Sequence, residues 1–214
     1  FGSHKGRSIG KMIELYQAQG FKHFAISSSG NAAIAAALFI TEHNQQNSEK
    51  LKLNIFVGKK INQEKFEMLQ DFSNKYITVE KTERPLQKLF QLLKTPFVKS
   101  LRQSTDDLSL VGYENLAKEL SLIPNLKAVF IPTSSGTLAQ ALGETFLKLG
   151  LKIQIHVVQT SFCHPISKEF DQNIIMEPSI ADAIVDMTAH RKEKVTEIIR
   201  KTKGFGWIVG DTEI

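Results

Sequence analysis

The sequence lacks the features that would place it outside the ordinary globular proteins. It has no apolar run near the roughly 18 residues of a membrane-spanning helix, and no signal-peptide pattern. Its single cysteine, Cys163, excludes a disulfide within the chain and fits a reducing compartment, so we expect a cytoplasmic protein. Repeats and low-complexity segments are also missing. With 42% hydrophobic and 23% charged residues, the 214-residue chain is expected to fold around a proper core.

Neither sign of charge dominates a segment of the chain. The net charge is +5 and the isoelectric point is near 9.2, but the basic residues are scattered among acidic ones. The run Arg191-Lys192-Glu193-Lys194 is typical of a solvated helix face. We therefore expect no nucleic-acid binding, while a modest basic excess suits an anionic small ligand. The histidines have no metal-ligand spacing, and we predict no metal site.

Strand and helix patterns alternate along the whole chain. Short apolar segments predict strands at 24–26, 53–57, 76–79, 128–131, 153–158 and 207–209. Amphipathic patterns predict helices at 8–19, 32–41, 63–72, 86–93, 110–120, 138–149 and 192–202. The polar segment 96–107 is predicted to be irregular. This alternation predicts an α/β fold of βαβ units, with parallel-rich sheets covered by helices.

A lysine near the start of the chain is the first candidate for chemistry. Lys5 lies among small residues in the run Gly2-Ser3-His4-Lys5-Gly6-Arg7. A lysine in such surroundings can lose its proton near neutral pH and form an imine with an aldehyde cofactor. A surface lysine near a frayed terminus can lie in a similar sequence. Lys5 alone therefore fits either a cofactor-binding lysine or a surface lysine.

Two loops between a strand and a helix are the other candidates. The first is Ser27-Ser28-Ser29-Gly30-Asn31 before the alanine-rich helix, and the second is Ser134-Ser135-Gly136-Thr137 after Pro132-Thr133. Amide groups at a helix N-terminus favour an anion, and small side chains let it approach. The second loop has neither the Gly-Lys-Ser/Thr of a Walker loop nor the glycine spacing of a dinucleotide fingerprint. Ordinary N-capping explains either loop equally well when it is taken alone.

Taken together, the three motifs resemble those of the fold-type II pyridoxal-phosphate enzymes. The family's lysine motif, roughly Gly-Ser-Phe-Lys-Asp-Arg, is matched by Gly2-Ser3-His4-Lys5-Gly6-Arg7. Its Ser-x-Gly-Asn loop is matched by Ser28-Ser29-Gly30-Asn31, and its phosphate loop by Ser134-Ser135-Gly136-Thr137. His4 and Gly6 replace the usual Phe and Asp, and serines replace two glycines of the phosphate loop. None of these changes removes a group that the chemistry requires.

The resemblance implies a role for each motif. Pyridoxal 5'-phosphate is the expected cofactor, held as an imine by the catalytic Lys5. Ser28, Ser29, Gly30 and Asn31 are expected to bind the carboxylate of an amino-acid substrate, with Asn31 also reaching the ring oxygen of the cofactor. The phosphate is expected to lie on the loop Ser134, Ser135, Gly136 and Thr137.

The expected activity is that of a lyase or synthase that eliminates or replaces a group at the β or γ carbon. Within the family, three segments are most similar to threonine synthase, which converts O-phosphohomoserine to threonine and phosphate: Ile131-Pro132-Thr133, Val158-Gln159 and Cys163-His164-Pro165-Ile166. The segment Leu101-Arg102-Gln103-Ser104-Thr105-Asp106 favours the same enzyme. Two alternatives stay open. One is another family member, such as a serine/threonine dehydratase or cysteine synthase, and the other is a non-catalytic relative that binds a phosphorylated ligand.

The resemblance also implies a domain organisation. A small mobile domain is expected at 21–111, and a large cofactor-binding domain at 1–20 plus 112–214, with a homodimer as the assembly. Asp211 with Glu213 soon after is typical of a helix start, and the chain begins without methionine inside its lysine motif. We therefore expect a fragment truncated at both ends, with the partner of the pyridine nitrogen beyond Ile214.

Overall fold

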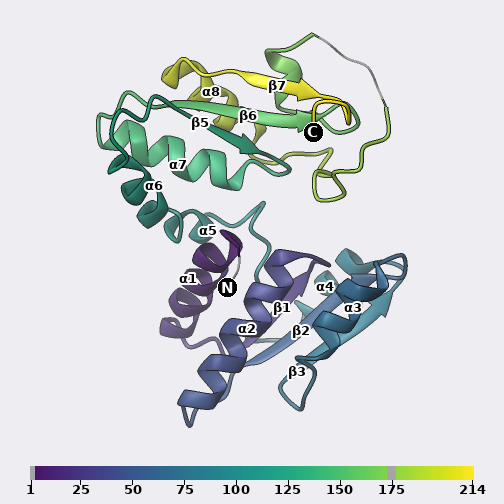
Figure 1. Cartoon of the computed structure of the whole chain (residues 1–214). Coiled ribbons are helices and arrows are strands. Elements are labelled where there is room, and N and C mark those ends of the chain that lie inside the picture. Colours follow the sequence, from purple (N-terminus) through teal and green to yellow (C-terminus); the bar gives the residue numbers. More distant parts are fainter. Residues whose placement is uncertain (1–2, 173–176) are drawn as a thin grey trace. The chain divides into compact units, whose positions relative to one another are not determined.

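The computed structural model describes residues 3–172 and 177–214 (Figure 1). Phe1 and Gly2, which precede and open the lysine motif, lie outside the described residues. The chain divides into two compact units, Phe1–Gly112 and Tyr113–Ile214. The expected grouping of 1–20 with 112–214 stays a prediction.

The first unit contains a four-stranded sheet in the order β3-β2-β1-β4, in which every pairing is parallel. Its elements in chain order are α1 (Lys5–Ala18), β1 (His23–Ser27), α2 (Asn31–Gln46), β2 (Lys52–Gly58), α3 (Gln63–Gln70), β3 (Ile77–Thr82), α4 (Pro85–Leu92), β4 (Val98–Ser100) and α5 (Leu108–Val111). The α/β alternation predicted from the sequence is confirmed here.

Both faces of this sheet are covered by packed side chains. Successive strand residues point to opposite sides, so each strand contributes to both faces. The face toward α1 and α2 carries the larger core, which includes Phe24, Ile26, Leu53, Ile55 and Val57. On the other face, Ala25 and Phe56 pack with Leu89 of α4. Every one of these side chains is at most 5% exposed. The cores on the two faces therefore hold strands β1 and β2 between the covering helices.

The second unit contains a three-stranded parallel sheet in the order β5-β6-β7. Its elements are α6 (Glu114–Ser121), β5 (Ala128–Pro132), α7 (Thr137–Lys148), β6 (Gln154–Thr160), the 3₁₀ helix η1 (Ser167–Glu169), α8 (Lys192–Thr202) and β7 (Gly206–Val209). Ile155 and Val157 of β6 pack into one core with Phe146 of α7 and Ile198 of α8. The last predicted helix, 192–202, has the bounds of α8.

The other face of this second sheet carries a row of aromatic rings. Phe130 stacks on His156 with 4.4 Å between ring centroids, and Trp207 Nε1 donates to His156 Nδ1 at 3.0 Å. His156 is buried, whereas Phe130 and Trp207 are 58% and 40% exposed. His156 is therefore a structural residue that links three neighbouring strands.

Two predictions for the middle of the chain are wrong. The segment 96–107 is not wholly irregular, because Val98–Ser100 form strand β4 and Leu101 N–H continues the pairing to Ala25 O at 2.9 Å. Three residues are too few to show strand alternation in a sequence. The helix predicted over 110–120 is two helices, α5 and α6, separated by Gly112 and Tyr113.

Gly112, which lies at this break, packs tightly against helix α1. A β carbon at Gly112 would lie 2.6 Å from Ser8 Cα and would also overlap Arg7 O. The backbone of Gly112 therefore lies directly against the first turns of α1, where no other residue fits.

Where a helix start was predicted after Gly210, the structure has a turn in which the Glu213 carboxylate accepts the Gly210 N–H at 2.9 Å. Within residues 3–172 and 177–214, no helix is long and apolar enough to cross a membrane.

The contact between Gly112 and α1 predicts a stability effect. We expect Gly112→Ala to lower the free energy of unfolding by more than about 2 kcal/mol, because helix α1 must shift to admit the methyl group. Gly58→Ala is the matched control, since its β carbon would lie 4.0 Å from Pro85 Cγ. That control should change stability by less than about 0.5 kcal/mol. Urea unfolding followed by circular dichroism measures both, and equal stabilities would contradict the packing described.

Candidate active site

Lys5 is the first residue of helix α1 and its side chain is half-buried. Burial lowers the pKa of its ammonium group, because a low-dielectric environment disfavours the charged form. The first turn of α1 contains no acidic residue, so the partial positive charge of the helix N-terminus acts in the same direction. A larger fraction of Lys5 is therefore neutral near pH 7 than of an exposed lysine.

The neighbouring hydroxyl of Ser3 lacks a partner. Its Oγ is buried and forms no hydrogen bond with the part of the chain that the structure describes. A buried hydroxyl without a partner costs free energy, and a ligand that pairs with it would recover this cost. Ser3 and Lys5 thus form a short segment with an amine and a hydroxyl available for a ligand.

Helix α1 is anchored firmly behind this segment. Ile9, Met12 and Ile13 are fully buried against the first sheet. Ser8 Oγ donates to Ser109 O at 2.7 Å and accepts from Gln103 Nε2 at 2.6 Å. These polar contacts were not predicted, because they join residues about 100 positions apart in the sequence. They fix the first turns of α1, and therefore the backbone of Lys5.

The Ser-Gly-Asn loop joins the end of β1 to the start of α2. Gly30 is the N-cap of α2, with φ −123°, and no side chain caps this helix. The Ser28 hydroxyl accepts the Gly30 N–H at 3.3 Å, while Ser29 and Asn31 are exposed. The ordinary N-capping interpretation therefore does not describe this loop. Its amides and side chains are placed to meet an anion from solvent.

Buried alanines form much of the surface by which α2 packs into the first core. Ala33, Ala35, Ala36 and Ala37 are at most 1% exposed, and Ile40 completes this face. Small side chains let the helix axis lie near the strands, which sets the height of the loop above the sheet.

The second loop joins the end of β5 to the start of α7. Its N-cap, Gly136, has a left-handed backbone with φ +88°, and no side chain caps α7. A β carbon at Gly136 would lie 2.9 Å from Val195 Cγ2 and 3.3 Å from Ile166 Cδ1. Glycine is thus required for two independent reasons, the backbone conformation and the lack of space.

The hydroxyl groups of this loop have local partners. Ser134 Oγ accepts the N–H groups of Val185 and Asp186 at 3.2 and 3.1 Å. The hydroxyls of Ser135 and Thr137 lie 3.0 Å apart. Because Ser134 uses its oxygen as an acceptor, its proton is still available to donate to an anion.

A buried glutamine supports the loop from behind. Gln159 is fully buried, and its Oε1 accepts the N–H groups of Ile166 and Ser167, both at 2.8 Å. Its Nε2 donates to Thr133 O at 3.2 Å, directly before the loop. One side chain therefore ties the segment 160–167 to the residue that precedes Ser134.

The burial of Arg191 differs from the expectation made from the sequence. The run 191–194 was interpreted as a solvated face, but Arg191 is only 6% exposed. Its Nη1 donates to Gln140 Oε1 at 2.9 Å, on the first turns of α7. A charged run gives no signal that one of its members is buried, so the sequence alone cannot identify this residue.

The structure distributes the predicted site residues over two units. Lys5 and the residues Ser28, Ser29, Gly30 and Asn31 belong to the first unit, and the residues Ser134, Ser135, Gly136 and Thr137 belong to the second. Each group lies at or beside the N-terminus of a helix. In residues 3–172 and 177–214, no cluster of three His, Cys, Asp or Glu side chains is placed to hold a metal ion.

Comparison with solved structures shows the same fold in several enzymes. A pyridoxal 5'-phosphate-dependent aspartate racemase is 21% identical with a TM-score of 0.77, over 99% of this chain and 65% of its own. Maize serine racemase is 19% identical with a TM-score of 0.77, over 99% and 64%. The processed form of threonine deaminase isoform 2 from Solanum lycopersicum is 19% identical with a TM-score of 0.75, over 97% and 60%.

These relatives are longer than the chain, which spans about two thirds of their length. A comparison with curated proteins gives no match. The family model described as "Pyridoxal-phosphate dependent enzyme" matches residues 1–214. This match covers the three motifs and both sheets, and the solved structures share the α/β fold of parallel sheets and helices. The chain therefore belongs to the pyridoxal-phosphate-dependent enzyme family, with the fold of its fold-type II members.

Proposed function

We propose that the complete protein uses pyridoxal phosphate to eliminate or replace a group at the β or γ carbon of an amino acid, with Lys5 as its catalytic lysine. The observation that carries this proposal is the half-buried Lys5, whose pKa is lowered by burial at the start of α1. An amine that is partly neutral near pH 7 is what attachment to an aldehyde requires.

The residues present fit the cofactor of the family. Ser3 has a buried hydroxyl without a partner among the described residues, two positions before Lys5. Gly136 provides a loop without a side chain at the N-terminus of α7, where amide groups and the helix dipole favour a phosphate. Ser135 and Thr137 add hydroxyl groups at the same loop. The chemistry that pyridoxal phosphate supplies when bound is the withdrawal of electrons from bonds at the α carbon of an amino acid.

We assign the protein's own residues the following roles. Lys5 Nζ holds the cofactor and, once free, takes the proton from the substrate α carbon. The loop of Ser28, Ser29, Gly30 and Asn31 binds the substrate carboxylate, and Asn31 also donates to the ring oxygen of the cofactor. The loop of Ser134, Ser135, Gly136 and Thr137 holds the phosphate. Closure of a mobile domain at 21–111 over residues 1–20 and 112–214 would exclude water.

For the substrate, we propose O-phosphohomoserine, as in threonine synthase. The segments that support this choice are 131–133, 158–159 and 163–166. The side chain of Gln159 hydrogen-bonds both Thr133 O and Ile166 N–H, so these three segments contact one another. A serine/threonine dehydratase is the second candidate, because the fold of the tomato threonine deaminase covers 97% of the chain. We further propose a cytoplasmic homodimer.

Labelling tests the catalytic lysine. Pyridoxal phosphate followed by borohydride should leave a pyridoxyl group on Lys5, because its lowered pKa makes it more nucleophilic at neutral pH than an exposed lysine. Lys5→Ala should lose this label. Lys11→Ala is the matched control, since Lys11 lies exposed on the same helix and pairs with Glu14 at 3.0 Å. Peptide mapping by mass spectrometry reads the result, and a complete protein unlabelled at Lys5 would favour a non-catalytic relative.

A substrate screen separates the candidate reactions. We expect phosphate release and threonine formation from O-phosphohomoserine, and at least about a 10²-fold loss of rate in Lys5→Ala. Formation of a 2-oxo acid from threonine or serine, without phosphate release, would instead assign a dehydratase. Cysteine formed from O-acetylserine and sulfide would assign a cysteine synthase.

A glycine pair tests the phosphate loop. Gly136 and Gly150 both have positive φ, +88° and +67°, but only Gly136 lacks space for a β carbon. Either alanine variant should lose about 1 kcal/mol from backbone strain. Gly136→Ala should lose more stability, and it alone should weaken the binding of pyridoxal phosphate, measured by equilibrium dialysis. Equal cofactor affinity in both variants would remove the loop from the site.

A further inference from the structure

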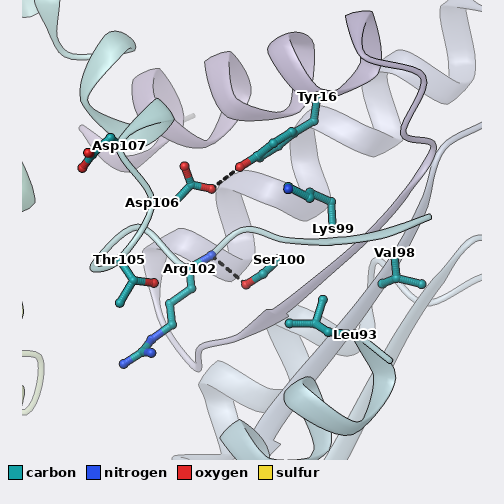
Figure 2. Close-up of a pocket in the computed structure, with 9 residues that line it drawn as sticks. All are labelled: Tyr16, Leu93, Val98, Lys99, Ser100, Arg102, Thr105, Asp106 and Asp107. Atoms are coloured by element: carbon teal, nitrogen blue, oxygen red, sulfur yellow. Dashed lines mark hydrogen bonds between the residues drawn. The ribbon is translucent and has the colours of Figure 1, made fainter. Parts of the chain in front are cut away.

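A cavity of about 410 Å³ lies in the first unit, lined by residues of α1, β4 and the segments beside β4 (Figure 2). Its lining consists of Tyr16, Leu93, Val98, Lys99, Ser100, Arg102, Thr105, Asp106 and Asp107. This volume suits a small molecule. None of the three proposed catalytic motifs contributes a residue to it, so it is a separate feature of the chain.

One acidic side chain of this cavity, Asp106, is held by hydrogen bonds to the protein itself. Asp106 Oδ2 accepts the phenol of Tyr16, and its Oδ1 accepts the Leu108 N–H at 3.0 Å. Burial and this hydrogen bond raise the pKa of Tyr16, so its phenol remains a donor. The carboxylate of Asp106 therefore fixes α5 to α1 and forms one wall of the cavity.

The contacts of Lys99 are of another kind, because its ammonium lies against aromatic rings. Its ammonium lies beneath the Tyr16 ring, 4.6 Å from the ring centroid (Figure 2). It also lies 5.1 Å from the centroid of the Phe21 ring. No carboxylate of the described residues lies within salt-bridge distance of it. The side chain is only half-exposed, so water does not hydrate the charge fully. Contact with aromatic rings orients an ammonium but does not neutralise it.

The remaining lining adds hydrogen-bond donors and an apolar wall. Ser100 Oγ accepts the Arg102 N–H at 3.2 Å, which leaves the hydroxyl proton to donate. Arg102 supplies a second positive charge, and Asp107 adds a second carboxylate beside that of Asp106. Leu93 and Val98 provide hydrocarbon surface on the same cavity. A cation, a hydroxyl donor and an apolar wall match a carboxylate that carries a short hydrocarbon chain.

We propose that this cavity binds a small organic carboxylate, with the Lys99 ammonium as its main contact. Ser100 donates to the same carboxylate, and the hydrocarbon chain of the ligand lies against Leu93 and Val98. The site is independent of the reaction assigned to the complete protein. Its occupant would connect strand β4, at the edge of the sheet, to the end of helix α1.

Ligand-observed saturation-transfer NMR on the complete protein tests this site. The probes are butyrate and butyramide at equal ionic strength, because they share a hydrocarbon chain and differ in charge. We expect saturable binding of butyrate, at least about tenfold tighter than that of butyramide, since the interaction with Lys99 requires a charged acceptor. Equal binding of the two probes would overturn the proposal.

Three variants locate the binding. Lys99→Gln should weaken butyrate binding at least about tenfold, whereas Lys99→Arg should retain it because the charge is kept. Lys94→Gln is the matched control, since Lys94 is an exposed neighbour outside the cavity. Circular dichroism and thermal unfolding without ligand confirm that each variant is folded. Unchanged binding in Lys99→Gln, or an equal loss in Lys94→Gln, would show that butyrate binds elsewhere.

Discussion

Burial of one face of helix α1 is the interaction on which both sites of the first unit depend. Ile9, Met12 and Ile13 are fully buried, and their combined transfer from water is worth several kcal/mol, roughly 2 for each side chain. This packing fixes the position of the whole 14-residue helix. Lys5 lies at its start and Tyr16 near its end, about 16 Å apart along the axis. One core therefore positions the proposed catalytic amine at one end and a wall of the proposed carboxylate cavity at the other.

The parallel sheets impose a second constraint. In a parallel sheet, each strand must be followed by a crossover, and the loop after the strand opens the next helix. The loops after β1 and β5 both follow this rule, and in both the N-cap is a glycine without a side-chain cap. The first amide groups of α2 and α7 are thereby offered to a ligand. The two anion sites that we propose, one in each unit, rest on this same feature of the fold.

The sequence was most informative where local pattern and packing agree. The bounds of α8, the strand β5 and the loops around Gly30 and Gly136 follow from patterns within a few residues. Strand β4 was missed, because Val98–Ser100 become a strand only by pairing with β1. The helix break at Gly112 was also missed, and the close contact of Gly112 with the backbone of Arg7 and Ser8 has no local signal in the sequence. Arg191 was misjudged because burial of a charge depends on distant partners such as Gln140.

The sequence by itself determined the α/β class, the parallel sheets, the family and the three motifs, because alternation, capping and small-residue loops act over short distances. Tertiary structure alone decided which members of these motifs have special environments. It buried Lys5 enough to lower its pKa, left Ser3 without a partner and placed Gly136 where no β carbon fits. It also assembled the cavity around Lys99 from segments that no local pattern connects. Burial and electrostatic environment come from contacts between residues far apart in the chain, and those contacts exist only once the chain has folded.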